Sequence, residues 1–455
     1  MKLLVRWLVV AIGLAALPAW GGVRPRYGGT LRVAMAESLA SLDPADAGDM
    51  VARARVTPLL FDTLVRVDAE GRGHPQLAVA WQADRSYKRW QFWLRPGVHF
   101  WDGGPLTSES VVAALSGRAE WKARADGEFV VIESEASRPG LLAELALARN
   151  AIVRRVSAGG LSGTGPFVTK SFVIGKSLEL AANDASWGGR PFVDGVQIEF
   201  GKTLREQMVE SQLGKVDVIE VGAEQIGKAE SEGRKAQVSL PVELVAVVGG
   251  PGKAKELDAL SLAVDRKSIQ SVLLRGGSEA AGGVLPEWMS GTGVLFPVQV
   301  DLEKGRAALK AGRPGSAVPT KSVKPLTLSC DAGDALARLL AERVALNARE
   351  VGLPVQVVTS SGTTSGDLRL MRIPLGSGDP GVALEEVGRA VGVKVAAGLS
   401  APGEIYLAEK KLMDDGGIVP LFHLPLASLV GERVRGFSVD KLGGWGLEED
   451  WVEGQ

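Results

Sequence analysis

The sequence is poor in the residues that build cross-links and metal sites. Its 455 residues include one cysteine, Cys330, and three histidines, His74, His99 and His423, which lie far apart. A single cysteine cannot form an intramolecular disulfide, and neither residue type shows the spacing of a zinc site. We therefore expect no disulfide framework, no metal site and no cofactor.

The sequence also lacks an excess of charge of either sign. Lys and Arg total 52 against 53 Asp and Glu, a formal net charge of −1, and no basic run stands out. Binding to nucleic acid through phosphate neutralisation needs a basic face, so we expect no nucleic-acid partner. Hydrophobic residues make up 45% and charged residues 23%, which is typical of a folded globular chain. The length predicts two or three lobes.

An uncharged apolar run follows Lys2 and Arg6 and extends over residues 7–17. A membrane-spanning helix needs about 20 apolar residues, so this run is too short to cross a bilayer. The basic start and the short run predict a secretory signal peptide over residues 1–21. A cut after Ala19 and an uncleaved anchor are the alternatives. No cysteine follows the run, so we expect an exported, periplasmic protein without a lipid anchor.

Local patterns predict a mixture of strands and helices. A short strand is expected over residues 30–35, a β-hairpin from 90–94 and 98–101, and helices capped by Thr107 and by the pair Thr203 and Glu206. Farther along, a strand at 326–330 and another at 353–358 flank an expected helix. The apolar stripe of that helix comprises Leu336, Leu340, Val344, Ala348 and Val351. This βαβ unit predicts a parallel sheet, and residues 310–325 predict a surface loop.

Motifs of common catalytic sites fail on spacing. The run 175–177 (Gly-Lys-Ser) lacks the upstream glycine of a phosphate-binding loop, because position 170 is lysine. Pro166 removes an N–H from the Gly163–Phe167 segment, which excludes a dinucleotide-binding turn. No G-x-S-x-G nucleophile elbow occurs. We expect no catalytic residues, and therefore a protein that is not an enzyme.

Tryptophan is frequent, with 11 residues against three tyrosines. Five tryptophans fall within one stretch of the chain: Trp81, Trp90, Trp93, Trp101 and Trp121. Aromatic side chains suit a cleft that encloses a ligand, but they also dominate ordinary cores. Both interpretations stay open at this point.

Several short motifs follow one another in a fixed order from residue 28 onward. They are 28–34, 41–44, 60–64, 75–81, 90–111, 163–167, 187–196, 214–219, 262–266 and 418–423. In this order and spacing the sequence resembles the family 5 extracellular solute-binding proteins, the peptide- and nickel-type receptors of ABC importers. The resemblance extends from about Gly28 to the C-terminus.

This resemblance implies an α/β fold, a bilobal clam-shell of the periplasmic-binding-protein type with an additional inserted lobe. Lobe I would comprise 22–52, 163–240 and 431–455, lobe II 53–162, and lobe III 241–430. Two connections near residues 244–248 and 421–424 would form the hinge. A ligand would lie between lobes I and III and be held by their closure.

The function that the resemblance implies is delivery of a solute to an inner-membrane ABC permease. The solute would be peptide-like or another small molecule, and the receptor would work as a monomer. A degenerate relative that does not transport, with a structural or interaction role, is the alternative. The candidate ligand-binding residues are Glu37, Ser38, Leu39, Trp101 and Asp379.

One motif departs from the pattern of peptide-binding members. Those receptors carry an acidic residue for the ammonium group of the peptide, in a motif similar to A-D-Y-P-D-P. The matching stretch here, 375–380, keeps only Asp379 and Pro380, and the acidic position falls on Gly376. A buried ammonium group without a counter-charge is costly, so this departure argues against peptides with a free amine.

Overall fold

The computed structural model describes most of the chain after the predicted signal peptide. The described residues are 26–46, 50–117, 120–156, 160–275, 277–310, 324–360, 366–447 and 450–453. The predicted signal peptide lies outside them, as does most of the predicted loop at 310–325. In the described part of the chain, no helix has both the length and the apolar character that crossing a bilayer requires.

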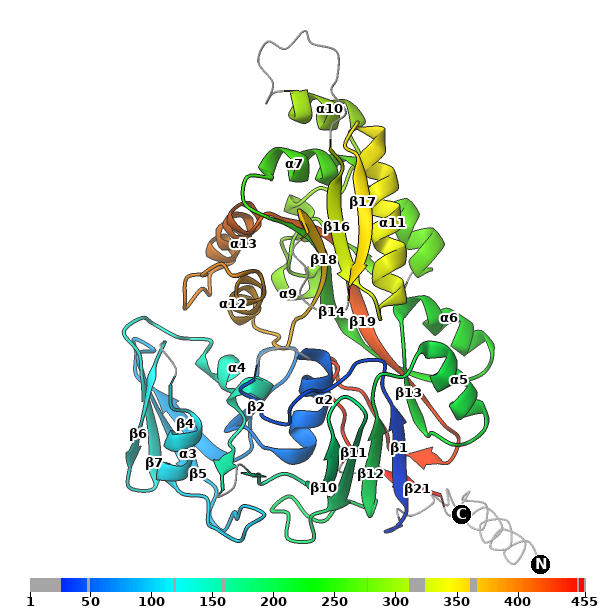
Figure 1. The fold of residues 1–455 in the computed structure, drawn as a ribbon. Coiled ribbons are helices and arrows are strands. Elements are labelled where there is room, and N and C mark those ends of the chain that lie inside the picture. Colours follow the sequence, from blue (N-terminus) through cyan, green and yellow to red (C-terminus); the bar gives the residue numbers. More distant parts are fainter. Residues whose placement is uncertain are drawn as a thin grey trace, which may run out of the picture.

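One mixed sheet of 11 strands runs through the molecule and joins two of its three lobes (Figure 1). Its strands, in spatial order, are β10 (Phe167–Val173), β11 (Ser177–Ala182), β12 (Gly195–Glu199), β1 (Thr30–Ala34), β13 (Val218–Val221), β19 (Ile418–Val430), β14 (Lys235–Gly249), β18 (Leu368–Pro374), β16 (Leu326–Asp331) and β17 (Val355–Ser360), with β15 (Glu279–Ala280) paired to β19. The first five strands belong to lobe I and β18, β16 and β17 to lobe III. Only β14 and β19 serve both lobes.

Lobe I is built from segments that are distant in the sequence. Strand β1 pairs in parallel with β12 and β13, and helix α2 (Met50–Leu60) packs on the same core. Val56 and Leu59 of α2 are buried there beside Leu31 and Val33 of β1. The boundary predicted between residues 52 and 53 falls within α2, and the division into lobes stays a prediction.

Lobe II contains a four-stranded antiparallel sheet in the order β4 (Ala78–Ala83), β5 (Arg89–Leu94), β7 (Phe129–Glu133) and β6 (Lys122–Asp126). Helix α3 (Ser108–Ala114) packs beside it and is capped by Thr107, as predicted. The hairpin predicted from 90–94 and 98–101 is wrong, because β4 and β7 occupy both edges of β5. Val98 and Phe100 enter the core of the lobe as side chains instead.

Lobe III confirms the predicted βαβ unit. Strands β16 and β17 are parallel and are connected by α11 (Ala335–Glu350). All five residues of the predicted stripe are buried. Strand β14 is covered on both faces, since Val245 and Val247 belong to the cluster under α11 while Leu244 and Ala246 belong to the cluster under α12 (Pro380–Val391) and α13 (Pro402–Gly416).

The capping pair Thr203 and Glu206 also forms as predicted, at the start of α5 (Leu204–Gln212). The Glu206 amide donates to Thr203 Oγ1 (3.3 Å), and the Thr203 amide donates to Glu206 Oε2 (2.8 Å).

The remaining elements are short or lie at the surface. They are β2 (Val65–Val67), β3 (Gly73–Pro75), α4 (Leu141–Leu145), η1 (Ala148–Asn150), β8 (Arg154–Arg155), β9 (Leu161–Ser162), α6 (Ala223–Ser231), α7 (Ala254–Ala263), α8 (Arg266–Ile269), η3 (Gln270–Leu274), α9 (Glu287–Ser290), η4 (Gly293–Leu295), α10 (Leu302–Lys310), β20 (Val434–Arg435) and β21 (Trp451–Val452).

The two shared strands are irregular where they pass between the lobes. The register of β14 against β19 shifts on both sides of Pro241, which faces Pro425. Proline has no N–H to donate, so the ladder is weakened at this point. Strand β13 pairs with β19 only at 427–430, and β18 pairs with β14 only at 243–249. The crossing therefore lies a few residues from the predicted hinge segments, which pair within lobe III.

Asp217 ties three distant segments of lobe I together. Its carboxylate accepts hydrogen bonds from Arg32 Nε (3.0 Å) and Nη2 (2.9 Å) on β1, and from Arg433 Nη2 (2.7 Å) after β19. Arg433 also donates to the carbonyl of Thr30 (3.2 Å). Burial opposes ionisation of Asp217, but the hydrogen bonds from Arg433 and Arg32 hold its pKa below the ordinary value.

We expect Asp217→Ala to lower the free energy of unfolding by about 2–4 kcal/mol, because it leaves two partly buried guanidinium groups without their counter-charge. Urea denaturation at pH 7 measures the change. The control is Asp184→Ala, which removes an exposed partner of Arg190 and should cost about 0.5 kcal/mol or less. Because the pKa of Asp217 is lowered by folding, its contribution in the wild type should fade as the pH falls toward that lowered value. Equal losses in the two variants would contradict the role of Asp217.

Candidate functional site

A cavity of about 1110 Å³ lies where the three lobes meet. Its wall combines α2 of lobe I, β2 and the segment around α4 of lobe II, residues 374–378 and α12 of lobe III, and the C-terminal segment 436–447. Small-molecule sites in proteins usually measure about 300–1,000 Å³, so this space is large enough for a small ligand. We call it the central cavity.

Helix α2 contributes two buried arginines to the wall. Arg53 donates to the backbone carbonyls of Ser41 (3.3 Å) and Asp43. Arg55 forms an ion pair with Glu220 on β13, and its guanidinium carbon lies 5.1 Å from the centre of the Trp445 ring. These contacts fix the inner face of α2 against lobe I.

Three aromatic side chains, Phe61, Trp187 and Trp445, line the central cavity. The orientation of Trp187 is set by Asp62, which accepts its indole N–H at 2.8 Å. Asp62 also accepts hydrogen bonds from Gln76 and Thr164, each at 2.7 Å. Burial raises the pKa of Asp62, while these three hydrogen bonds act to lower it. The hydrogen bond to Asp62 thus fixes the orientation of the Trp187 ring in the wall.

Two exposed arginines face the central cavity from opposite lobes. Arg66 lies on β2 of lobe II, and Arg389 lies in the last turn of α12 of lobe III. Within the ranges that the structure describes, neither forms an ion pair. Their guanidinium groups can therefore donate hydrogen bonds to an acidic ligand group.

A buried ion pair closes the wall between lobes II and III. Arg149 Nη1 lies 2.9 Å from Glu386 Oε1, and Glu386 also accepts the amide N–H of Gly376 at 3.2 Å. A Cβ atom added at residue 376 would lie 3.5 Å from Glu386 Oε2. The carboxylate that sequence comparison finds missing at position 376 is thus supplied by α12, but Arg149 neutralises it.

The predicted residues Glu37, Ser38 and Leu39 lie behind the wall of the central cavity. Glu37 accepts the amide N–H of Ala52 in the first turn of α2 (3.0 Å). Ser38 is exposed, and Leu39 is buried in the core of lobe I. None of the three is among the lining residues.

Trp101 and Asp379 also lie outside the lining of the central cavity. The Trp101 ring packs on Phe61, with 5.5 Å between ring centres, and its indole donates to the carbonyl of Gly165 (3.4 Å). Asp379 caps α12 by accepting the amide N–H of Val382 at 2.9 Å. The five predicted residues therefore surround the cavity as a second layer, and their contact with a ligand stays a prediction.

Glu37 belongs to a charge cluster at the junction of lobes I and III. Arg372 of β18 donates to both oxygens of Glu243 on β14 (2.9 and 2.6 Å) and to Asp334 (2.7 Å). Burial, and secondly the charge of Glu243, raise the pKa of Glu37 to about 7, although Arg372 and Arg55 oppose this shift. Glu37 is therefore largely protonated below neutral pH.

Sequence reasoning missed most of the lining. Trp90 and Trp121 of the predicted tryptophan group are core residues, 5% and 3% exposed, in lobe II. The tryptophans that do line the cavity are Trp187 and Trp445. Trp187 lies in one of the recognised motifs and could have been proposed. Trp445, Arg149 and Glu386 carry no local signal, because only the packing of distant segments brings them to the cavity.

Two further side chains of the described part of the chain, His423 and Cys330, are buried in lobe III. No group of three or more His, Cys, Asp or Glu residues is arranged there to hold a metal. His423 is buried, its Nε2 lies 3.0 Å from the carbonyl oxygen of Val284, and burial lowers its pKa to about 4. Burial also raises the pKa of the Cys330 thiol. Both residues act as parts of the lobe III core.

Residues 73–372 match the profile of the bacterial extracellular solute-binding proteins, family 5. The nickel-binding periplasmic protein of Escherichia coli is 26% identical over 345 residues, which cover 66% of this chain and 66% of that protein. The oligopeptide-binding protein AppA of Bacillus subtilis is 25% identical over 247 residues, covering 46% and 45%. The chain thus spans about two thirds and about half, respectively, of the lengths of these relatives.

Solved structures match over nearly the whole chain. The structure of AppA from Bacillus subtilis in complex with a nonapeptide superposes with a TM-score of 0.77 at 17% identity, covering 95% of this chain and 100% of that one. NikA from Staphylococcus aureus in complex with Ni(L-His)2 gives 0.79 at 14% identity, covering 93% and 100%. At this identity the likeness establishes the bilobal fold, as the sequence resemblance implied.

The raised pKa of the half-buried Glu37 predicts a specific pH dependence of stability. Its folded-state pKa is raised from 4.5 to about 7, so its contribution to stability is lost as the pH rises between these values. Relative to the wild type, Glu37→Gln should therefore gain about 2 kcal/mol of unfolding free energy between pH 5 and pH 8, as measured by urea denaturation. Glu230→Gln, an exposed change on α6, should track the wild type at both pH values. A Glu37→Gln variant whose difference from the wild type is the same at both pH values would contradict the assignment.

Proposed function

Because the chain belongs to the family 5 bacterial extracellular solute-binding proteins, we propose that it is a periplasmic receptor that delivers a small solute to an inner-membrane ABC permease. The observation that carries this proposal is the central cavity of about 1110 Å³, enclosed by all three lobes. The predicted signal peptide supports the periplasmic location. A space of this size argues against the filled interlobe surface that a non-transporting relative would have.

Ligand capture follows from the construction of the lobes. We propose that lobe III moves relative to lobe I about the irregular crossing at Pro241 and Pro425. A ligand that contacts both sides of the cavity interacts fully only when the lobes are together, so binding shifts the population toward the closed state. No bond is made or broken in this cycle, and we propose that the protein is a monomeric receptor and not an enzyme.

The wall of the central cavity limits the class of ligand. Phe61, Trp187 and Trp445 offer apolar faces, while Arg66 and Arg389 offer donors for an acidic group. No histidine is among the described lining residues, which gives a histidine-ligated metal complex no local support. We propose a small molecule with an apolar body and an acidic group, such as a peptide-like compound without a free amine.

A bulky side chain added to the wall of the central cavity should weaken binding. Ala54 is an exposed residue of α2 that lines the cavity, so Ala54→Trp should place an indole in the space for the ligand without disturbing a core. Calorimetry on the chain from residue 22, with peptides, opines, oligosaccharides and metal chelates as probes, identifies a ligand. Ala54→Trp should then lower its affinity at least about tenfold, because the added volume leaves no room for closure around it.

The matched control is Ala113→Trp on the exposed side of α3, away from the lining residues. It should bind the same probe with wild-type affinity. If no probe binds the wild type and small-angle scattering shows no closure with any of them, the receptor function is contradicted.

The paired carboxylate of Glu386 makes a second prediction about ligands. An ammonium group beside Gly376 would meet Arg149, which already neutralises Glu386. A dipeptide with an acetylated N-terminus should therefore bind at least about tenfold more tightly than the same dipeptide with a free amine, since a desolvated like-charge contact is unfavourable. Arg149→Gln should reduce the difference in affinity between the acetylated and the free dipeptide. A preference for the free amine in the wild type would contradict the proposed ligand class.

A further inference from the structure

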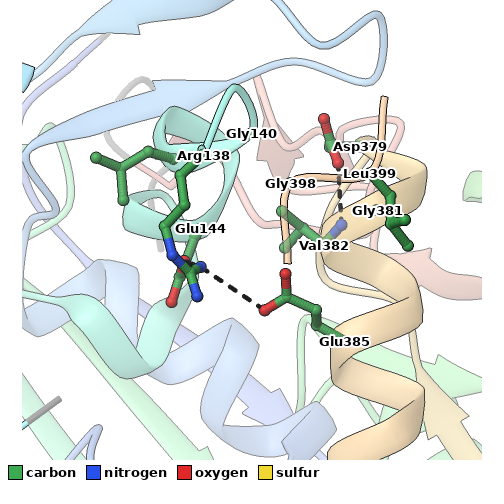
Figure 2. A pocket seen from close by; sticks show the side chains of 10 residues that line it. Arg138, Gly140, Glu144, Asp379, Gly381, Val382, Glu385, Gly398 and Leu399 are labelled. Carbon is green, nitrogen blue, oxygen red and sulfur yellow. Dashed lines mark hydrogen bonds and ion pairs between the residues drawn. The ribbon is translucent and has the colours of Figure 1, made fainter. Parts of the chain in front are cut away.

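The contact between lobes II and III holds more carboxyl groups than arginines. Figure 2 shows Arg138 and Glu144 at α4 facing Asp379 and Glu385 of the α12 segment. Arg138 Nη1 lies 2.8 Å from Glu144 Oε2 and 3.8 Å from Glu385 Oε2. Arg138 and Glu144 are 6% and 4% exposed, so this arginine is shared between two carboxylates in a buried position.

The neighbouring ion pair, Arg149 with Glu386, adds no net positive charge to this contact. Arg149 binds Glu386, which is 7% exposed, at 2.9 Å. The interface therefore contains four carboxyl groups, those of Glu144, Asp379, Glu385 and Glu386, and two buried or half-buried arginines, Arg138 and Arg149. Arg389 lies one turn farther along α12 and is exposed. We call this set of groups the carboxyl interface.

The lobes approach each other closely around the carboxyl interface. A Cβ atom added at Gly398 of lobe III would lie 2.1 Å from the backbone oxygen of Ser137 in lobe II. A Cβ atom added at Gly140 of lobe II would lie 3.3 Å from the carboxylate of Asp379. Glycine at these two positions lets the backbones meet. The carboxyl groups are therefore withdrawn from water by the contact between lobes.

The charged groups that act on Glu385 come from lobe II and from the α12 segment itself, where Asp379 and Glu386 share the interface with it. Arg138, Glu144 and Arg149 come from lobe II, and Arg389 comes from its own helix. Helix α13, which packs on α12, contributes the apolar side chains of Ile405 and Leu412 to the shared core, and its buried Glu409 accepts the amide of Leu285 instead.

Burial dominates the electrostatics of this interface. It raises the pKa of Glu385 from 4.5 to about 7, with Arg138 opposing the shift and Glu144 adding to it. Burial also raises the pKa of Glu386, against Arg149 and Arg389, and that of Asp379, against the amides of Val382 and Gly381. Burial thus raises the pKa of all three carboxyl groups on the lobe III side, and Glu385 is the one whose pKa reaches about 7.

We propose that lobe II closes on lobe III with uptake of protons at the carboxyl interface, so that mild acidification favours the closed state of the receptor. The inference rests on the lobe movement in the proposed function and adds a regulation of the same site. It assigns Glu385 as the main proton acceptor, since Arg138 is shared with Glu144 and cannot fully compensate it.

The direction follows from linkage. With the lobes apart, Glu385 faces water and titrates near its ordinary value of 4.5, whereas in contact it titrates near 7. Between these values the closed state binds a proton that the open state does not, so the closing equilibrium shifts toward closure as the pH falls. The closing constant should rise between about ten- and a hundredfold from pH 8 to pH 5.

The test measures the distance between the lobes in the ligand-free chain from residue 22. Spin labels are placed at exposed positions of lobes II and III by Glu128→Cys and Lys410→Cys, with Cys330→Ala to remove the native thiol. Double electron–electron resonance then gives the closed fraction from pH 5 to pH 8. We expect the short-distance population to grow as the pH falls, at least tenfold relative to the long-distance population. A single unchanged distance over this range would overturn the proposal.

Two glutamine substitutions separate Glu385 from general effects of pH. Glu385→Gln keeps the shape but cannot titrate, so it should stay as closed at pH 8 as at pH 5, with most of the pH dependence gone. Glu342→Gln, in the exposed pair with Arg338 on α11, should behave as the wild type. A Glu385→Gln variant with the wild-type pH dependence would overturn the proposal, and circular dichroism checks that both variants are folded.

The outcome is independent of whether a ligand is found. If closure follows pH but none of the solutes tested by calorimetry binds or promotes closure, the proton uptake stands and the receptor function is contradicted. Closure that follows ligand but not pH would remove the proton uptake and leave the receptor function standing.

Discussion

The pairing of β14 with β19 is the constraint on which the molecule depends. These strands are the only members of the large sheet that belong to both lobe I and lobe III (Figure 1). Their pairing is irregular on both sides of Pro241, which faces Pro425 between the lobes, and the register shifts once more between Val245 and Ala246 within lobe III. Two missing N–H donors weaken the ladder at one crossing, which is where we propose that the lobes tilt. The central cavity lies beside this crossing, with Val242 and Leu426 in its wall, so the proposed ligand capture and the proposed lobe movement are coupled.

Ion pairs join segments that are distant in the sequence, both within lobe I and between lobes II and III. Within lobe I, Asp217 joins segments more than 180 residues apart through Arg32 and Arg433. Between lobes II and III, Arg149 and Arg138 face Glu386 and Glu385. A small apolar cluster also joins these two lobes, in which Ala143 and Leu147 of lobe II pack on Val382 of α12. In the proposed movement of the lobes the ion pairs can form and separate, because open-state carboxylates and guanidinium groups are well solvated. The same chemistry makes the interface sensitive to pH.

The elements that could be predicted are those whose signal is local. The capping residues Thr107 and Thr203 start helices because their side chains bind amides three residues ahead, and the stripe of α11 is buried because its spacing follows the helix period. The hairpin at 90–101 failed because edge strands cannot be distinguished from central ones by alternation alone. Helix α2 was not predicted, because its two arginines and Pro58 interrupt the apolar pattern in the sequence. Its apolar residues are seen to share one face only where they pack on the core of lobe I.

The order and spacing of short motifs were enough to identify the family and its bilobal architecture, and also to show that familiar catalytic motifs are missing from the sequence. Each of these properties depends on short stretches of neighbouring residues. The lining of the central cavity could not be predicted from the sequence, because it combines four separate parts of the chain, represented by Phe61, Arg149, Trp445 and Glu386. Gly376 shows the difference most directly. In the sequence, position 376 lacks the carboxylate that the resemblance leads us to expect. In the folded chain, the carboxylate of Glu386 accepts the amide N–H of Gly376, and Arg149 neutralises its charge. Pairing between distant residues depends on how the lobes pack, and only the folded chain decides it.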